Sequence, residues 1–238
     1  MASHHLHTLP ACLAALFILA GPAAAHDLWV EREGRLHTLL FGHQHSGHAG
    51  TGRLEYPPEQ VKRMACFNGA GREMPAEPGR TYPVTLRGEC AATWFLTSSG
   101  YWSKTPYGTR NLPKTEAGGA VLASWLSVES VKRLDAWGEP LARPLTRELE
   151  IVTLANPLGL KVGDKLRLAV YRDGCPAEGV TVAYFGHPRG VTGADGQVNI
   201  RLREPGYQLI QASLDLPLTD GKADKAVHAT ALVFEVPR

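Results

Sequence analysis

The sequence has little net charge. Its 25 Lys and Arg residues are nearly balanced by 23 Asp and Glu, which leaves +2 at neutral pH. Proteins that bind nucleic acid need a basic stripe against the phosphates, so this balance argues against a nucleic-acid partner. Residues 1–25 contain no Lys, Arg, Asp or Glu, so the net charge belongs entirely to the chain that follows.

Long apolar runs are also scarce. The run Leu9 to Gly21 is well short of the roughly 20 residues that a spanning helix needs. It is followed by Ala23-Ala24-Ala25, and small residues at the first and third of these positions are the pattern that signal peptidase cleaves. We therefore expect residues 1–25 to be a signal peptide. The mature chain would be exported, would begin at His26 and would have no membrane span.

Cysteine is rare, and Cys12 would leave with the signal peptide. No Cys-x-x-Cys is present, which disfavours a structural zinc knuckle. Cys66 and Cys90 fall in two predicted strands and could form a disulfide worth about 3 kcal/mol, although three free thiols are the alternative. Cys175, in the turn Asp173–Pro176, is the odd one out.

Several catalytic motifs are missing. The sequence has no Gly-x-Ser-x-Gly elbow, no phosphate-binding loop and no His-Glu-x-x-His helix. Nothing in it therefore indicates hydrolytic chemistry.

Short runs of alternating apolar and polar residues are plentiful. Their spacing between Gly and Pro turns predicts an all-β chain of two β-sandwich-type domains, 26–145 and 146–238. Residues 98–108 are expected to be a loop, and residues 116–137 suit a short helix as well as a strand. The predicted strands are His26–Glu31, Leu36–Phe41, Val61–Phe67, Thr81–Leu86, Cys90–Thr97, 166–170, 180–184, 198–202, Tyr207–Ala212 and 230–236.

Histidines gather in the glycine-rich segment Gly42–Gly52. His43, His45 and His48 lie close together there, and His26 would carry a free amine beside its imidazole. Imidazole binds nickel, cobalt, copper and zinc. An unperturbed terminal amine titrates at about 7.7–8.0, so binding should weaken as the pH falls. These four residues are the predicted metal ligands.

Other histidines and aromatic residues favour structural roles. His37 lies on a predicted strand, His187 in a turn, and His228 on the packed face of the last strand. Asp27 should point away from His26, which makes it a weak candidate ligand. Trp29, Tyr101 and Trp102 could form a platform for a sugar or peptide, but core packing is the stronger interpretation.

Four segments together resemble a family of exported bacterial proteins. They are His26–Val30, Gly42-His43, Gly100–Thr105, and Asp173-Gly174-x-Pro176 with Thr192-x-x-Asp195-Gly196. The family carries a domain of unknown function numbered 4198, includes NikM-like proteins and often accompanies nickel and cobalt uptake systems. The last segment also resembles carboxypeptidase-regulatory-like and immunoglobulin-like modules. Cys175 departs from the pattern, since similar sequences have a polar residue there.

The resemblance implies a periplasmic protein concerned with divalent transition metals. The leading hypothesis is a non-catalytic binding protein for Ni²⁺ or Co²⁺, with Cu²⁺ or Zn²⁺ as alternatives, whose partner is a metal-uptake permease or another envelope protein. A second hypothesis is a copper-dependent oxidase or monooxygenase in which the terminal His26 forms a histidine brace. A third is a structural or adhesion module of the cell envelope in which the histidines are incidental.

Overall fold

The computed structural model describes residues 27–44 and 52–237. In these two stretches the only helical segments are the short 3-10 turns η1 (Pro58–Gln60) and η2 (Glu139–Ala142). Neither has the length or apolar character to cross a membrane. All other regular elements in the same stretches are β-strands, so the prediction of an all-β chain is confirmed.

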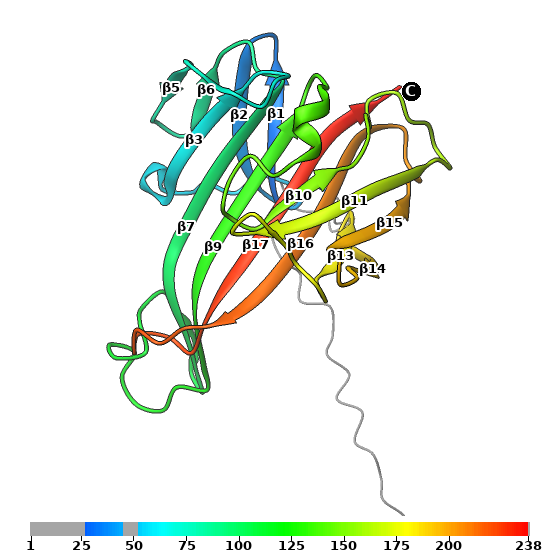
Figure 1. Cartoon of the computed structure of the whole chain (residues 1–238). Helices are drawn as coiled ribbons and strands as arrows, with labels where there is room; N and C mark the ends of the chain where they lie inside the picture. Colours follow the sequence, from blue (N-terminus) through cyan, green and yellow to red (C-terminus); the bar gives the residue numbers. More distant parts are fainter. Residues whose placement is uncertain (1–26, 45–51, 238) are drawn as a thin grey trace, which may run out of the picture.

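The described strands form three sheets that stack as layers, as Figure 1 shows. The central sheet has the strand order β14-β13-β16-β17-β9-β7-β3-β4, and β8 pairs with the far part of β7. Its strands are β3 (Val61–Phe67), β4 (Glu73–Met74), β7 (Ala92–Thr105), β8 (Gly108–Arg110), β9 (Ala123–Leu134), β13 (Thr181–Tyr184), β14 (His187–Val191), β16 (Gly206–Pro217) and β17 (Lys225–Val236).

Smaller sheets cover the two faces of the central sheet. The first outer sheet has the order β1-β2-β6-β5, and its strands are β1 (Asp27–Glu33), β2 (Leu36–Gly42), β5 (Glu77–Gly79) and β6 (Thr85–Arg87). The second outer sheet has the order β10-β11-β12, with β15 also paired to β11. Its strands are β10 (Glu150–Thr153), β11 (Lys165–Arg172), β12 (Cys175–Pro176) and β15 (Gln197–Arg201).

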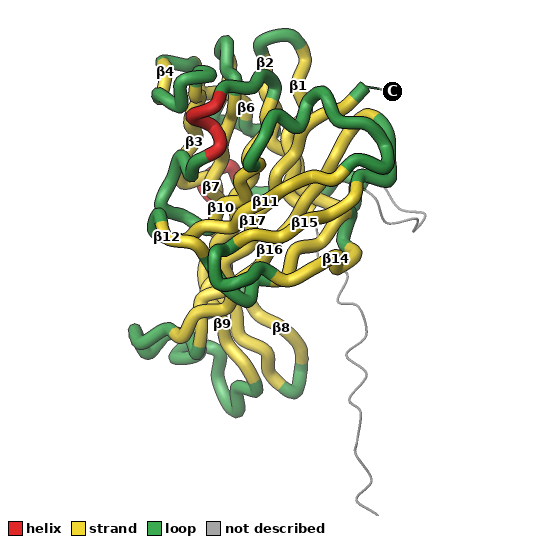
Figure 2. Tube along the Cα trace, turned by 45° about the vertical axis from the view of Figure 1, so that its right-hand side comes forward, coloured by secondary structure: helices red, strands yellow, loops and turns green. Residues whose placement is uncertain are grey.

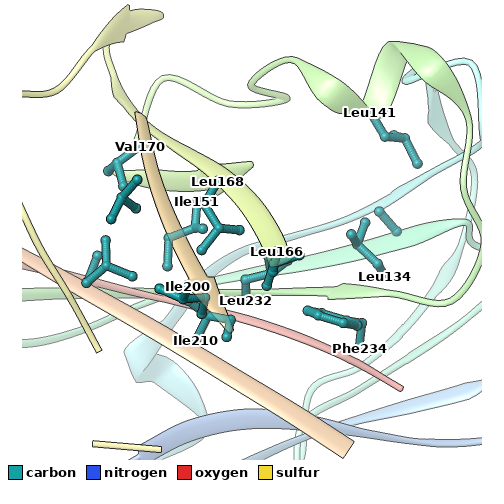
Figure 3. Packing of buried hydrophobic residues seen from close by; sticks show 14 of the residues in the cluster. Leu134, Leu141, Ile151, Leu166, Leu168, Val170, Ile200, Ile210, Leu232 and Phe234 are labelled. Atoms are coloured by element: carbon teal, nitrogen blue, oxygen red, sulfur yellow. The ribbon is translucent and has the colours of Figure 1, made fainter. Parts of the chain in front are cut away.

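Alternation along β17 explains why both faces of the central sheet are covered. Successive side chains of a strand point to opposite faces. Leu232 and Phe234 pack with residues of the second outer sheet, and Figure 3 shows this cluster. Ala231 and Val233 pack with residues of the first outer sheet. One strand therefore contributes to two hydrophobic cores.

The central sheet crosses the predicted domain boundary near residue 146. β17 pairs in parallel with β9, from Lys225 opposite Trp125 to Phe234 opposite Leu134. The two predicted units, 26–145 and 146–238, therefore share one sheet. The physical reason is that β17 is apolar on both faces and is buried only when it lies in the middle of a layered structure.

A buried ion pair joins the central sheet to the second outer sheet. Lys132 Nζ lies 2.6 Å from Glu150 Oε1, and the two side chains are 2% and 1% exposed. The Glu150 carboxylate also accepts hydrogen bonds from the backbone N–H groups of Leu145 and Thr146. Hydrogen bonds of this kind offset the cost of removing a carboxylate from water.

The segment 98–108, predicted as a loop, is mostly strand. β7 continues to Thr105, and its register with β9 shifts between Thr97 and Gly100. The Ser98 hydroxyl donates to the Ser127 carbonyl at 2.6 Å and replaces part of the backbone ladder at this shift. The ambiguous segment 116–137 likewise contains strand β9 and no helix. Residues 100–127 and 215–227, which we call the arm, extend away from the outer sheets (Figure 2).

The described cysteines follow the predicted pattern. Cys66 in β3 and Cys90 just before β7 are joined by a disulfide across 24 residues of sequence. Cys175 is exposed and outside any disulfide. The disulfide therefore fixes β3 to the start of its neighbouring strand β7.

Candidate functional site

The described ends of the histidine-rich segment are held together by backbone hydrogen bonds. β1 and β2 are antiparallel, and their register runs from Glu33 opposite Leu36 to Asp27 opposite Gly42. Beyond this ladder the His43 N–H donates to the Gly52 carbonyl at 2.7 Å. The two ends of the segment therefore lie side by side at the edge of β1 and β2, an arrangement that we call the loop base.

Gly42 is required at the loop base. Its φ is 146°, and a Cβ atom built on it would lie 2.1 Å from the Gly52 carbonyl oxygen. Side chains do not tolerate either condition, which explains why glycine precedes the first histidine.

Asp27 ties the loop base to the central sheet. Its side chain is largely buried, and Oδ2 accepts a hydrogen bond from the Gln44 backbone N–H at 3.1 Å. Oδ1 accepts another from Gln211 Nε2 in β16 at 2.7 Å. Asp27 was expected to be a weak ligand, and the structure shows a positioning contact for both carboxylate oxygens. The sequence carried no signal for Gln211, which lies far along the chain.

The structure describes one of the four predicted metal ligands. His43 is half-buried and directly follows β2 at the loop base. His26, His45 and His48 lie outside the described residues. Within residues 27–44 and 52–237, no three His, Cys, Asp or Glu side chains are grouped so that they could hold a metal ion. The predicted four-histidine set is thus neither assembled nor excluded by these residues.

His37 and His228 have structural roles as predicted, whereas His187, predicted to lie in a turn, is the first residue of strand β14. The buried His37 ring has Nε2 at 3.0 Å from Asp135 Oδ2 and Nδ1 at 3.3 Å from the Leu86 carbonyl. His187 is exposed in β14. His228 is buried in β17, and burial, aided by the positive charge of Arg172, lowers the pKa of its imidazole.

A partly open hollow lies beside the loop base on the same face of the central sheet. Its lining includes Leu28 from β1, Gln211 from β16, Glu129 from β9, and small residues of β13 and β17. Burial raises the pKa of the Glu129 carboxyl, while the Ser127 hydroxyl that donates to Oε1 at 3.1 Å opposes this shift. Sequence reasoning missed this carboxyl, since only strand pairing brings β9 and β16 near β1.

Tyr207 adds a second buried polar group under the loop base. Burial raises the pKa of its hydroxyl, and the nearby Arg133 and Gln44 side chains oppose that shift only in part. Because Gln44 follows His43 in the chain and interacts with Tyr207, the loop base contacts polar groups of the central sheet.

The three aromatic residues singled out by sequence do not form one platform. Trp29 is 2% exposed and belongs to the core under the first outer sheet. Tyr101 and Trp102 lie in the arm, where the Trp102 ring stacks on Trp125 with centroids 6.4 Å apart. The core-packing interpretation is confirmed for Trp29.

The fold and the loop base define an all-β protein of layered sheets in which a histidine, His43, directly follows the second strand. The chain belongs to the family described as Domain of unknown function (DUF4198), which matches residues 23–215. The match includes β1, the loop base and strands on both sides of residue 146. No match is found among the curated proteins.

Proposed function

We propose that the protein is a non-catalytic periplasmic binding protein for a divalent transition metal. Ni²⁺ or Co²⁺ is the expected ion, with Cu²⁺ or Zn²⁺ as alternatives. The protein would serve metal uptake by delivering the ion to a permease or another envelope protein. The observation that carries this proposal is the register of β1 and β2 at the loop base.

That register bears on the pairing of two predicted ligands. The last described pair is Asp27 opposite Gly42. One further step of an antiparallel ladder opposes positions 26 and 43, and opposed side chains share a face with Cβ atoms about 4.5–5.5 Å apart. Two imidazoles at that separation can bind one ion. His26 lies outside the described residues, so its pairing with His43 is part of the proposal.

The surrounding chemistry supports a histidine site. Neutral imidazole and a terminal amine suit nickel, cobalt, copper and zinc. Both carboxylate oxygens of Asp27 already accept hydrogen bonds, so this residue would position the site and leave binding to nitrogen ligands. Protons compete for those nitrogens, so affinity should fall as the pH is lowered.

Calorimetric titration of each metal tests the site. The protein should begin at His26, verified by mass spectrometry, and should bind one ion per chain. His43→Ala should weaken binding by at least the roughly 10–100-fold that the loss of a ligand's supporting partner causes. One extra glycine ahead of His26 should also weaken it, because the amine is then displaced. His187→Ala, which removes an exposed histidine of β14, is the matched control and should have no effect.

Three results would contradict the proposed site: unchanged affinity in His43→Ala, unchanged affinity in the extended protein, or a natural first residue other than His26.

The proposed role in metal uptake is tested separately. Cells that lack the protein should accumulate less nickel or cobalt when supply is limiting, and normal accumulation would contradict that role.

A further inference from the structure

The arm ends in a hairpin that presents an aromatic residue to solvent. Thr105 pairs with Gly108, so Pro106 and Tyr107 form the turn between β7 and β8. The Tyr107 side chain is 93% exposed. Figures 1 and 2 show that the β7–β9 loops lie at the end of the molecule farthest from the outer sheets. We call residues 104–114 and Leu122 the arm tip.

Further apolar side chains accompany Tyr107. Leu122 is 62% exposed, and its N–H donates to the Lys104 carbonyl at 2.8 Å, which places it beside the hairpin. Leu112 is 38% exposed. Tyr107 lies in the turn of the hairpin, Leu112 follows β8 and Leu122 directly precedes β9, so these exposed apolar side chains belong to the same end of the arm.

The charge of the arm tip is positive. Residues 104–114 contain Lys104, Arg110 and Lys114 and no acidic residue. Lys114 is paired with Asp224 at 2.7 Å, and Arg110 Nη1 donates to the Ala117 carbonyl at 3.2 Å. Among the described residues, neither Lys104 nor Arg110 forms an ion pair with a carboxylate.

Three of the four acidic residues of the arm, Asp215, Asp220 and Asp224, have side-chain partners within it, and the fourth, Glu116, is exposed just beyond residues 104–114. Asp220 accepts the Tyr101 hydroxyl at 2.6 Å, and Asp224 accepts the Ser124 hydroxyl at 2.6 Å in addition to Lys114. These contacts lower the pKa of both carboxyls. Within residues 104–114, the exposed Lys104 and Arg110 are therefore the cations that lack a carboxylate partner among the described residues.

A stiff platform supports the tip. Trp102 and Trp125 are opposed in the register of β7 and β9, and their rings stack with an angle of 11° between the planes. Lys222 Nζ lies 5.7 Å from the centre of the Tyr101 ring. The tip is therefore carried by paired strands whose aromatic side chains contact one another.

We propose that the arm tip docks on an anionic phospholipid surface. Tyr107 and Leu122 enter the interface between headgroups and acyl chains, where amphipathic aromatic rings are favoured. The side chains of Lys104 and Arg110 extend beside Tyr107 and Leu122 and contact the lipid phosphates. A negatively charged membrane attracts each such cation, and the attraction decreases with added salt.

Vesicle flotation tests the proposal on the chain from residue 26 onward, which retains every described strand. It should bind vesicles that contain phosphatidylglycerol and leave pure phosphatidylcholine vesicles unbound. Tryptophan fluorescence should shift to shorter wavelength on binding, since Trp102 and Trp125 lie behind the tip. Tyr107→Ser with Leu122→Ser should reduce the partition coefficient by about tenfold or more. Lys104→Glu with Arg110→Glu should reduce it by more than roughly fivefold per removed cation.

Matched controls make the outcome decisive. Val162 and Val191 are 53% and 58% exposed outside the arm, so Val162→Ser with Val191→Ser should bind like the unmodified chain. Circular dichroism checks that each variant is folded, and the charge-reversed pair provides a second test if the apolar pair is not. The proposal is overturned if anionic vesicles are not bound, if both tip pairs bind normally, or if the tip variants abolish self-association and leave vesicle binding intact.

Discussion

The backbone conformation of Gly42 bears directly on the proposed metal site, because Gly42 precedes His43. It ends β2, pairs with Asp27 and also forms an isolated bridge with Arg53 on the far side of the histidine-rich segment. Three stretches of backbone meet at this residue, which leaves no space for a side chain. The geometry of His43 therefore depends on its neighbour having no Cβ atom.

Gly42→Ala should destabilise the protein by more than about 2 kcal/mol, since it combines an unfavourable φ with a steric clash. Gly34→Ala is the matched control, because Gly34 also has positive φ, 58°, but no atom within 4 Å of a built Cβ. That change should cost only about 1 kcal/mol. Urea denaturation measures both free energies of unfolding, and equal costs would contradict the steric argument.

At the scale of single residues, the sequence predicts local structural roles better than it predicts tertiary contacts. The glycines that frame the histidines and the structural role of His37 follow from local pattern. The contacts of Asp27 with Gln211 and of Lys132 with Glu150 do not, because each joins strands from different sheets. Of the candidate site, His43 is placed by the structure, while Glu129 and Tyr207 could be found only after strand pairing was known.

Among the elements, β3 and β7 are joined both by a ladder and by the Cys66–Cys90 disulfide. β3 lies near one edge of the central sheet, with only the short β4 beyond it. A covalent link is useful at such a position, since an edge strand has few neighbours to hold it.

Replacing Cys66 and Cys90 together by alanine should reduce the free energy of unfolding by about 3 kcal/mol, the value expected for a loop of this size. Cys175→Ala should change it by less than about 0.5 kcal/mol, because Cys175 is exposed and unbridged. Thermal denaturation with and without a reducing agent provides the measurement. If a reductant lowered the stability of the double variant as much as that of the unmodified chain, its effect would not come from the Cys66–Cys90 disulfide.

The strands β2 and β3 were predicted within one residue of their observed bounds because apolar alternation is local information. The sequence predicts that β7 ends at Thr97, because Ser98, Ser99 and Gly100 are ordinary turn residues. In the structure the strand continues through this register shift, because side chains bond to its backbone carbonyls. The Asn111 side-chain amide donates to the Ser99 and Tyr101 carbonyls, each at 2.8 Å. That compensation comes from residues outside the strand, so a local pattern could not show it.

At the scale of the whole molecule, a network of charged groups links the first outer sheet to the central sheet. Asp135 follows β9 and contacts His37 of β2 at 3.0 Å and Arg133 at 2.8 Å. The Arg133 guanidinium also donates to the Val30 carbonyl and to Glu235. Burial alone would raise the pKa of the Asp135 carboxyl, but the contacts with His37 and Arg133 outweigh it, and the pKa is lowered.

This lowered pKa predicts how stability depends on pH. The pKa of an aspartate in an unfolded chain is about 3.9. The stabilisation that the ionised Asp135 provides is therefore fully present above about pH 5, and it is lost as the pH falls through the lower pKa of the folded state. Asp135→Asn should therefore be less stable than the unmodified chain at pH 7. The difference should narrow as the pH is lowered toward 3. Urea denaturation across this range measures it, and a constant difference would contradict the role of the charge.

The layered architecture also shows where prediction from sequence ends. Alternating strands indicate β-sandwiches, and the apolar residues on both faces of β17 fit a buried strand. The parallel pairing of β17 with β9 joins residues about 100 positions apart. No local pattern encodes which distant strand will be the partner, so the shared central sheet becomes visible only in the folded protein.

The position of β17 has a consequence for biogenesis. This strand lies between β16 and β9 in the middle of the central sheet, yet it is the final strand of the described sequence. While the chain is still emerging from a ribosome, β9 and β16 each lack this neighbour, and both cores are open until residue 236 has been released. We therefore expect the two hydrophobic cores to close only after β17 has been synthesised.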